Sequence, residues 1–292
     1  NAAITVDEEG LDTANALGSA ENPLVVGEES TLERASDTVT FLAGSDAITG
    51  MVFGSTALLT ANVNGIAGND IVWSAGGGTV ITGTIGGLLA ITITLTPILA
   101  GPTGTATGTV NVVLSDNFPH INALGQNTIT LTGLVVTASE ADTTSADATV
   151  TITVVDDIPD AVNDTAQSVA EDFVGTIGGT VMANDTQGAD GAVVTSITVN
   201  GITTIVPVGG LTYSNANGTY TMTQAGVWTF DPNNNLVNPA DATFSYTITD
   251  GDGDPDTALQ PITIIDGKAL TATKNAAITV DEEGLDTANA LG

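Results

Sequence analysis

Alternating apolar and polar residues, the pattern of a half-buried β-strand, recur along most of the chain. The clearest run is ATVTITVV at residues 148–155, and similar runs cover residues 89–96 and 128–137. Residues 243–249 and 257–265 alternate in the same way and predict a final hairpin. Clusters of Gly, Asn and Asp separate the runs, as turns require, and no helical period is evident. The pattern predicts an all-β protein.

The composition agrees with this prediction and suggests more than one domain. Thr is very frequent and stands beside many Val and Ile, residues that suit a pleated sheet. A chain of 292 residues corresponds to about two domains at ~150 residues each. Short strands with regular turns are typical of β-sandwiches.

An exact internal repeat marks the largest period of the sequence. Residues 1–18 and residues 275–292 are identical, NAAITVDEEGLDTANALG in both places. We therefore expect the chain to be one 274-residue period and the start of the next, cut from a tandem array.

A weaker repeat divides this period into two. TITVVD at residues 151–156 resembles PITIID at residues 261–266, an offset of 110 residues. The same offset places Glu140 on Asp250 and Asp142 on Asp252. VDEE at residues 6–9 also resembles VAED at residues 169–172. We predict two tandem Ig-like sandwich domains, at 1–157 and 158–267, with 268–292 as a linker and the start of the next repeat.

The charge excludes several classes of function. The chain has 34 Asp and Glu against 3 Lys and Arg, for a net charge of -31. It cannot gain affinity by neutralising phosphates, so we expect no nucleic-acid partner, and anionic lipid surfaces are disfavoured too. No cysteine is available for disulfides or thiol chemistry, and the single His argues against a zinc centre. No apolar run reaches the ~20 residues of a membrane span, so we expect no membrane insertion. Most carboxylates therefore need a counter-charge from outside the chain, and a divalent cation is the simplest one.

The sharpest local signal is DGDGDPD at residues 250–256. Alternating Asp and Gly crowd carboxylates onto a tight turn, and calcium takes six to eight oxygen ligands. The loop is no EF-hand, since a strand follows it and no Glu stands at the twelfth position. Calcium binding is the favoured interpretation, and a solvated acidic hairpin turn is the alternative.

The topology of a seven-strand sandwich brings further acids to the same place. The last hairpin loop of the second domain and the loop at residues 184–190 should lie at its N-terminal end, facing the first domain. The first domain should contribute its bottom turn there. The acids expected at this joint are Glu8, Glu9, Asp156, Asp157, Asp160, Asp164, Asp185, Asp190, Asp250, Asp252, Asp254 and Asp256. By the same logic, Glu171, Asp172 and Asp266 should face the next repeat, and Glu140 and Asp142 the preceding one.

Several segments of the second domain resemble a known group of repeats. They are PDAVNDT at residues 159–165, VAED at 169–172, VMANDT at 181–186 and FSYTITDGDGD at 244–254. In this order they are similar to the bacterial cadherin-like and VCBS-type repeats of giant RTX adhesins, which type I systems secrete. The first domain resembles the longer repeats of these adhesins.

This resemblance implies a function and a place. It implies stacked cadherin-like sandwiches on the bacterial cell surface, serving cell adhesion and biofilm formation as a stalk, with Ca²⁺ at the joints and the acids named above as ligands. Their partners are neighbouring repeats of the same chain, and a host-surface glycan or protein would be bound by other domains of the parent protein. One departure is the stretch at residues 267–274, where two lysines replace the Asp-Pro-Asp pattern. We expect fewer ions and more flexibility at that joint.

Other features have ordinary explanations. GIAGNDI at residues 65–71 resembles half of an RTX nonapeptide, but a β-roll needs stacked copies, so a turn is the favoured interpretation. His120 is interpreted as a structural loop residue, and the Thr runs as the outer face of strands rather than an ice-binding surface. Trp and Tyr could form a sugar platform, but so few aromatics favour the core. No deep cleft or Ser–His set is predicted, so we expect no enzyme.

The sequence thus supports one main hypothesis and two alternatives. The main hypothesis is an extender module of an extracellular adhesin, stiffened by calcium at acidic joints. The first alternative is a glycan- or protein-binding module, with the loops at residues 44–54 and 97–108 as the place to look. The second is a subunit of an extracellular filament, in which residues 275–292 complete a neighbouring sandwich.

Overall fold

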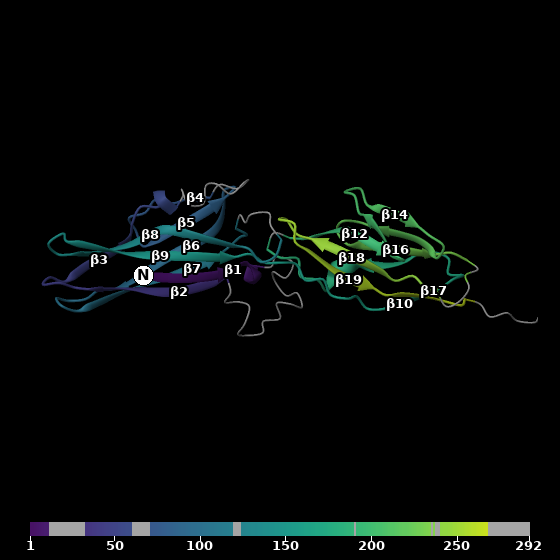
Figure 1. Ribbon diagram of the computed structural model, residues 1–292, viewed down its shortest axis with the longest axis horizontal. Coiled ribbons are helices and arrows are strands. Elements are labelled where there is room, and N and C mark those ends of the chain that lie inside the picture. Colours follow the sequence, from purple (N-terminus) through teal and green to yellow (C-terminus); the bar gives the residue numbers. More distant parts are fainter. Residues whose placement is uncertain are drawn as a thin grey trace, which may run out of the picture.

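The computed structural model describes residues 1–11, 33–59, 71–118, 124–189, 191–234, 236 and 240–267, with the side chain of Glu9 left out. Two β-bodies lie end to end and give the described chain an elongated shape (Figure 1). Strands dominate, and helical turns such as η1 (Glu8–Leu11) and η3 (Val181–Ala183) are short. The predicted all-β, Ig-like sandwich class is confirmed.

The first body is a sandwich of two sheets. A four-stranded sheet has the order β1-β9-β8-β3 and a five-stranded sheet has the order β2-β7-β6-β5-β4. The bounds are β1 Ala2–Asp7, β2 Arg34–Leu42, β3 Ile48–Phe53, β4 Val72–Trp73, β5 Val80–Ile85, β6 Leu88–Ile98, β7 Thr105–Leu114, β8 Thr128–Glu140 and β9 Ser145–Val155.

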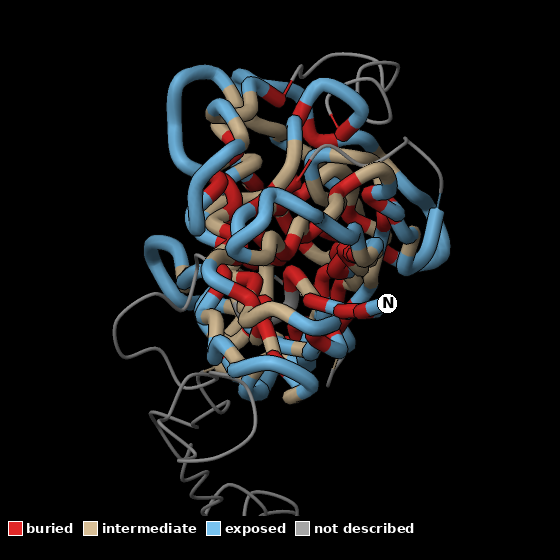
Figure 2. Tube along the Cα trace, turned by 90° about the vertical axis from the view of Figure 1, so that its left-hand side faces the viewer, coloured by how far each residue is buried: buried red, intermediate tan, exposed pale blue. Residues whose placement is uncertain are grey.

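The alternation of apolar and polar residues decides which side chains of these strands face the space between the two sheets. In β9, Val150, Ile152 and Val154 are buried while the threonines between them are only partly covered. The other strands do the same, and their inward side chains form one contiguous apolar core. Figure 2 shows the buried residues gathered in the interior and the exposed ones in the outer loops. The strands predicted at residues 89–96, 128–137 and 148–155 fall within β6, β8 and β9.

The second body has three smaller sheets. Their strand orders are β11-β16-β15-β14, β13-β12-β18-β19 and β10-β20-β17. The bounds are β10 Gln167–Ala170, β11 Ile177–Thr180, β12 Val193–Val199, β13 Ile202–Ile205, β14 Leu211–Ser214, β15 Gly218–Met222, β16 Val227–Pro232, β17 Ala240–Asp241, β18 Phe244–Thr249, β19 Pro255–Gln260 and β20 Ile262–Ile265.

Aromatic side chains fill the second core. Trp228 packs edge-on against Phe244, with ring centroids 5.5 Å apart, and Tyr220 lies 4.6 Å from Phe230. Trp228, Tyr220 and Tyr246 are almost completely buried. These buried aromatic residues therefore serve the core, where such pairs add to the free energy of area burial.

Each body begins with an edge strand that pairs in parallel with its last strand. Val6 of β1 lies beside Val154 of β9, and Val169 of β10 lies beside Ile264 of β20. Val154 and Ile264 occupy matching positions in the similar segments 151–156 and 261–266. Val6 and Val169 likewise occupy matching positions in the similar segments 6–9 and 169–172. The register therefore agrees with the weaker internal repeat.

The final hairpin differs from its prediction in one respect. β18 pairs with β19 as expected, but the single strand predicted over residues 257–265 is wrong. Strand β19 ends before Pro261, and the chain continues after it as β20, which pairs with β10 and β17. Proline has no backbone N–H to donate to a sheet, so a change of sheet at this residue is favoured.

Candidate metal site at the joint

Three acidic segments meet where the two bodies join. Strand β1 leads into η1, which carries Glu8, and β9 leads directly into Asp156 and Asp157. The loop between β18 and β19 brings Asp252 and Asp254 from the second body. The result is two overlapping triads, Glu8–Asp156–Asp157 and Asp156–Asp252–Asp254, in each of which one carboxylate oxygen per residue lies within 4.8 Å of the others.

These carboxylates are withdrawn from water without a nearby basic side chain. The exposed fraction is 1% for Glu8, 5% for Asp156 and Asp157, and 4% for Asp254. Among the described residues Arg34 is the one Lys or Arg, and its guanidinium pairs with Glu33 at 2.9 Å. Two unit charges 4 Å apart repel by ~1 kcal/mol in water and ~4 kcal/mol at an effective dielectric of 20. The arrangement therefore calls for a positive charge from solution.

Backbone N–H groups already bind part of this cluster. Glu8 accepts a hydrogen bond from the Phe118 N–H within the first body. Asp157 accepts one from the Ala189 N–H of the second body at 2.6 Å. Asp254 accepts one from the Gly125 N–H of the first body, also at 2.6 Å. The last two bonds tie the bodies together.

The remaining oxygens provide a test of whether a cation fits. Asp252 Oδ2 and Asp254 Oδ2 are buried and have no hydrogen-bond partner among the described residues. A buried carboxylate oxygen without a donor is costly, whereas oxygen atoms are the ligands that calcium prefers. The residues present therefore fit a hard divalent cation such as Ca²⁺.

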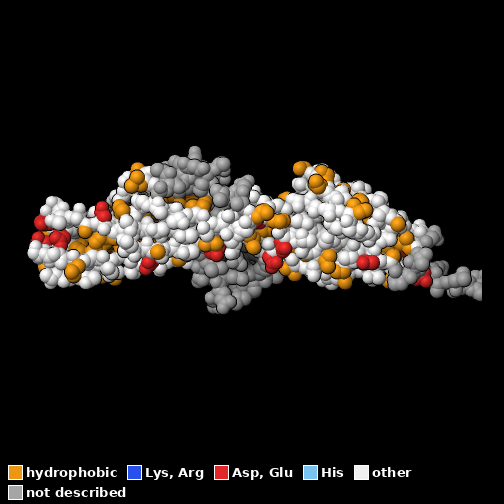
Figure 3. Space-filling model, viewed as in Figure 1, with side chains coloured by type: hydrophobic (Ala, Val, Ile, Leu, Met, Phe, Trp, Pro, Cys, Tyr) orange, Lys and Arg blue, Asp and Glu red, His pale blue; other side chains and the backbone are white. Residues whose placement is uncertain are grey.

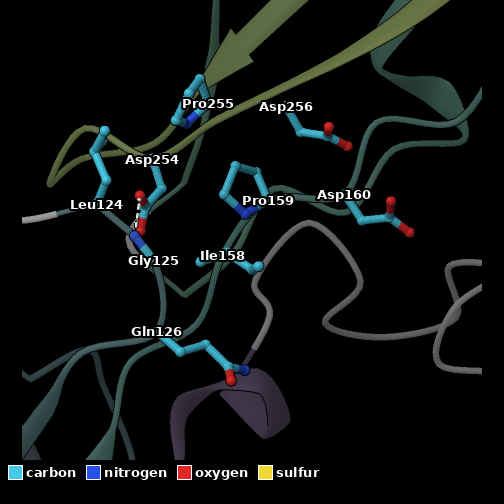
Figure 4. A pocket seen from close by; sticks show the side chains of 9 residues that line it. All are labelled: Leu124, Gly125, Gln126, Ile158, Pro159, Asp160, Asp254, Pro255 and Asp256. Atoms are coloured by element: carbon cyan, nitrogen blue, oxygen red, sulfur yellow. Dashed lines mark hydrogen bonds between the residues drawn. The ribbon is translucent and has the colours of Figure 1, made fainter.

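A groove of about 610 Å³ borders this cluster (Figure 4). Its lining comes from both bodies and from the linker between them, residues 156–166. Asp254 turns towards Gly125, while Asp160 and Asp256 lie on the opposite side. Asp256 accepts a hydrogen bond from the Ala161 N–H at 2.7 Å, and Asp160 forms a backbone bridge with Thr186. These two acids lie at the joint, outside the two triads.

Three other predicted ligands have structural contacts within the second body. Asp250 accepts hydrogen bonds from the N–H groups of Gly253 and Asp254 and so shapes the turn. Asp185 is buried and accepts hydrogen bonds from the Val162 N–H and the Tyr246 hydroxyl, at 2.8 and 2.9 Å. Asp164 lies near Asp185, whose charge acts on it. The structure does not bring these three into the triads.

The acids predicted for the outer joints lie at the two outer ends of the elongated molecule, away from the joint between the bodies. Glu171 accepts a hydrogen bond from the Leu236 N–H, much as Glu8 does from Phe118, and Asp172 and Asp266 are exposed beside it. Glu140 accepts a hydrogen bond from the Gly44 N–H at the opposite tip, where Asp142 binds the Thr144 N–H at 2.9 Å. Asp190 and the Glu9 side chain lie outside the described residues. Acidic side chains are visible at the outer end of the first body and beside the joint (Figure 3).

Asp164 provides a prediction of pH dependence. Burial and then the charge of Asp185 raise the pKa of Asp164 from 3.8 to about 7. The folded state therefore holds a proton that the unfolded state has lost between these values, so this group's contribution to stability falls as pH rises from about 4 to 7. Asp164→Asn should remove that loss. In urea unfolding with EDTA, the free energy of unfolding of the variant should rise relative to that of the unaltered chain between pH 5 and pH 8. An equal pH response of both chains would contradict this.

Gly188 provides a second prediction. It has φ of +78°, and a Cβ there would lie 2.4 Å from Asp157 Oδ2. Gly188→Ala should combine the left-handed backbone cost with displacement of that carboxylate, lowering the free energy of unfolding by about 1–3 kcal/mol. Gly201→Ala is the control, because φ is +76° there and nothing lies within 4 Å of its Cβ. Equal thermal midpoints for the two variants would show that the contact with Asp157 contributes nothing.

The backbone donors of the joint are what sequence reasoning misses. The N–H groups of Gly125, Phe118 and Ala189 bind its carboxylates, and every residue type except proline carries such a donor. The available signal is glycine, since Gly125 and Gly188 both have positive φ in the loops that approach the joint.

The second body matches a known family model over most of its length. Residues 156–263 match the family model of the bacterial Ig domain. The match begins at the shared carboxylate Asp156 and ends in β20. Bacterial Ig domains are typical of extracellular adhesion or structural modules. A search of curated proteins finds no match.

Two solved structures show a distant likeness to this chain. Mouse clustered PcdhgC3 EC1-3 is 15% identical, with 70% of this chain and 63% of that chain covered and a TM-score of 0.29. Drosophila N-cadherin EC1-4 is 17% identical, with coverage of 71% and 46% and a TM-score of 0.25. The protein thus spans less than two thirds of either chain, and at these scores the likeness carries no functional argument. No helix in the described part is long and apolar enough to cross a membrane.

Proposed function

We propose that the protein is an extender module of a bacterial surface adhesin, in which calcium at the acidic joint fixes one sandwich relative to the next. The observation that carries this proposal is the pair of triads sharing Asp156. Their members come from the first body, the linker and the loop between β18 and β19, so cations bound in the two triads would connect these segments through Asp156.

The mechanism follows from the charges of these side chains. Without a cation, five carboxylates repel one another and favour separation of the two bodies. The hydrogen bonds from Gly125 and Ala189 hold Asp254 and Asp157 in place across the joint. Calcium would supply a positive charge and bind the carboxylate oxygens that accept no hydrogen bond. The joint then resists bending, which is the property that a stalk needs.

The match to the bacterial Ig domain supports the class of module, and the exact 18-residue repeat supports a tandem array. We include in this proposal the division into domains at 1–157 and 158–267, an extracellular location, export by a type I system and a role without catalysis. Weak sites with affinities of ~10⁻⁴–10⁻³ M would be filled by millimolar extracellular calcium. A surface glycan or protein would be bound by other parts of the parent protein.

Small-angle X-ray scattering tests the proposal. The chain is measured in EDTA and then with calcium added stepwise to several millimolar. A profile that turns rod-like, with a maximum dimension that becomes constant, is the expected result. A profile unchanged by calcium would show that these carboxylates do not fix the joint through a bound cation and would favour the binding-module alternative. Magnesium serves as the control, because it accepts an irregular cage of carboxylates poorly.

A further inference from the structure

The second body contains a buried hydrogen-bond donor that its core does not use. Trp228 on β16 is 1% exposed, and its indole N–H has no hydrogen-bond partner among the described residues. The ring itself packs against Phe244. An unpaired buried N–H costs free energy, and native proteins rarely keep one. This N–H therefore calls for an acceptor beyond the described residues.

The space beside this N–H is open. Trp228 lines a groove of about 290 Å³ to which β10, β11 and the linker at 156–166 also contribute. Gly179 of the edge strand β11 lies beside Trp228 in the sheet and has no side chain to cover the ring. A Cβ at Gly179 would lie 3.5 Å from the indole nitrogen, an ordinary contact distance. The N–H edge of the ring thus faces the groove.

An unused acceptor lines the same groove. Asp164 Oδ2 is buried and has no hydrogen-bond partner among the described residues. Two neighbouring amides are already engaged, since Gln260 donates to the Thr165 carbonyl at 3.1 Å and Asn184 donates to the Val162 carbonyl at 2.8 Å. The groove therefore offers a free donor and a free acceptor.

Charge and size narrow the chemistry of a ligand. Asp164 is the one ionisable side chain among the described lining residues, and together with a net charge of -31 it disfavours an anion. The indole N–H can only donate, so it offers nothing to a cation. A hydroxyl group accepts and donates, and so it can pair with both Trp228 and Asp164. The volume lies at the lower end of the ~300–1,000 Å³ of ligand pockets, which suits a single ring.

We propose that this groove binds a neutral, hydroxyl-bearing ligand of the size of one sugar residue. One hydroxyl of the ligand accepts a hydrogen bond from the Trp228 indole N–H and donates one to Asp164 Oδ2. All lining residues lie between 164 and 260, within the second body, so the site does not depend on calcium at the joint. It is additional to any target that other parts of the parent protein bind.

The indole N–H signals in nuclear magnetic resonance spectra of the nitrogen-15-labelled full chain test this directly. The chain has two tryptophans, so two such signals are expected, and a Trp73→Phe variant assigns them. In EDTA, the methyl glycosides of glucose, galactose, mannose and N-acetylglucosamine are each added to tens of millimolar. At least one should shift the Trp228 signal saturably and leave the Trp73 signal in place. No shift of the Trp228 signal with any of these sugars would assign the groove to ordered water and overturn the proposal.

A blocked groove and a ring without hydroxyls are the controls. Gly179→Ala places a methyl group in the groove without a clash, and it should weaken sugar binding about tenfold or more by displacing the bonded hydroxyl. Gly209→Ala should bind like the unaltered chain, because nothing lies within 4 Å of a Cβ there. Tetrahydropyran should leave the Trp228 signal in place. Sugar binding unchanged by Gly179→Ala, or a response to tetrahydropyran equal to that of the sugar, would overturn the proposal.

Discussion

Asp156→Asn is expected to reverse its effect on stability between EDTA and calcium. In EDTA the variant should be at least as stable as the unaltered chain, since one of five mutually repelling charges is removed. In millimolar calcium it should be less stable, because Asp156 belongs to both triads and its loss weakens each. We expect calcium affinity to fall about tenfold or more, as the charge count of the ligands sets affinity in such sites.

Thermal unfolding and isothermal titration calorimetry measure these two quantities. Asp147→Asn is the matched control, as it removes the same charge from an exposed position on β9, where Asp147 accepts a hydrogen bond from the Thr137 hydroxyl at 2.6 Å. That variant should bind calcium like the unaltered chain. A loss of affinity in both variants would indicate a diffuse charge effect, and a loss in neither would remove Asp156 from the site.

Much of the fold could be predicted from the sequence because the strand period is local. Alternation over residues 148–155 gives β9, and the offset of 110 residues anticipates that Val154 and Ile264 occupy equivalent positions beside Val6 and Val169. The alternation does not predict the change of sheet at Pro261, because it continues across this residue and only the missing N–H of proline marks the change.

The candidate site could be predicted only in part. Loop topology places acids near the joint, and Glu8, Asp156, Asp157, Asp252 and Asp254 do lie together there. Side-chain direction is not encoded in that argument. Asp185 turns inward to Tyr246, and Asn184 donates hydrogen bonds to the carbonyls of Val162 and Asn163, so this Asn-Asp pair fastens the linker to the second core. A count of acids in a loop cannot separate such a clamp from a metal ligand.

Tyr246→Phe is expected to cost the second body about 1.5–3 kcal/mol, the range for a hydrogen bond to a charged group. The Tyr246 hydroxyl lies 2.9 and 3.0 Å from the two Asp185 oxygens, and both side chains are buried. Burial and the charge of Asp185 raise the pKa of Tyr246, so the phenol keeps the proton that it donates. Phenylalanine would leave the Asp185 carboxylate in the core with a lost donor.

The size of this effect should depend on Asp185, and a double-mutant cycle in urea unfolding tests that dependence. Tyr246→Phe should cost markedly less in an Asp185→Asn background, where no charge needs the hydroxyl. Tyr213→Phe, at a half-buried position on β14, is the control and should change stability by less than about 0.5 kcal/mol. If Tyr246→Phe cost no more than this control, the bond would not hold the linker. A cost above that of the control would measure how firmly the interior clamp at Asp185 keeps the linker, and with it Asp156 and Asp157, in position for the joint.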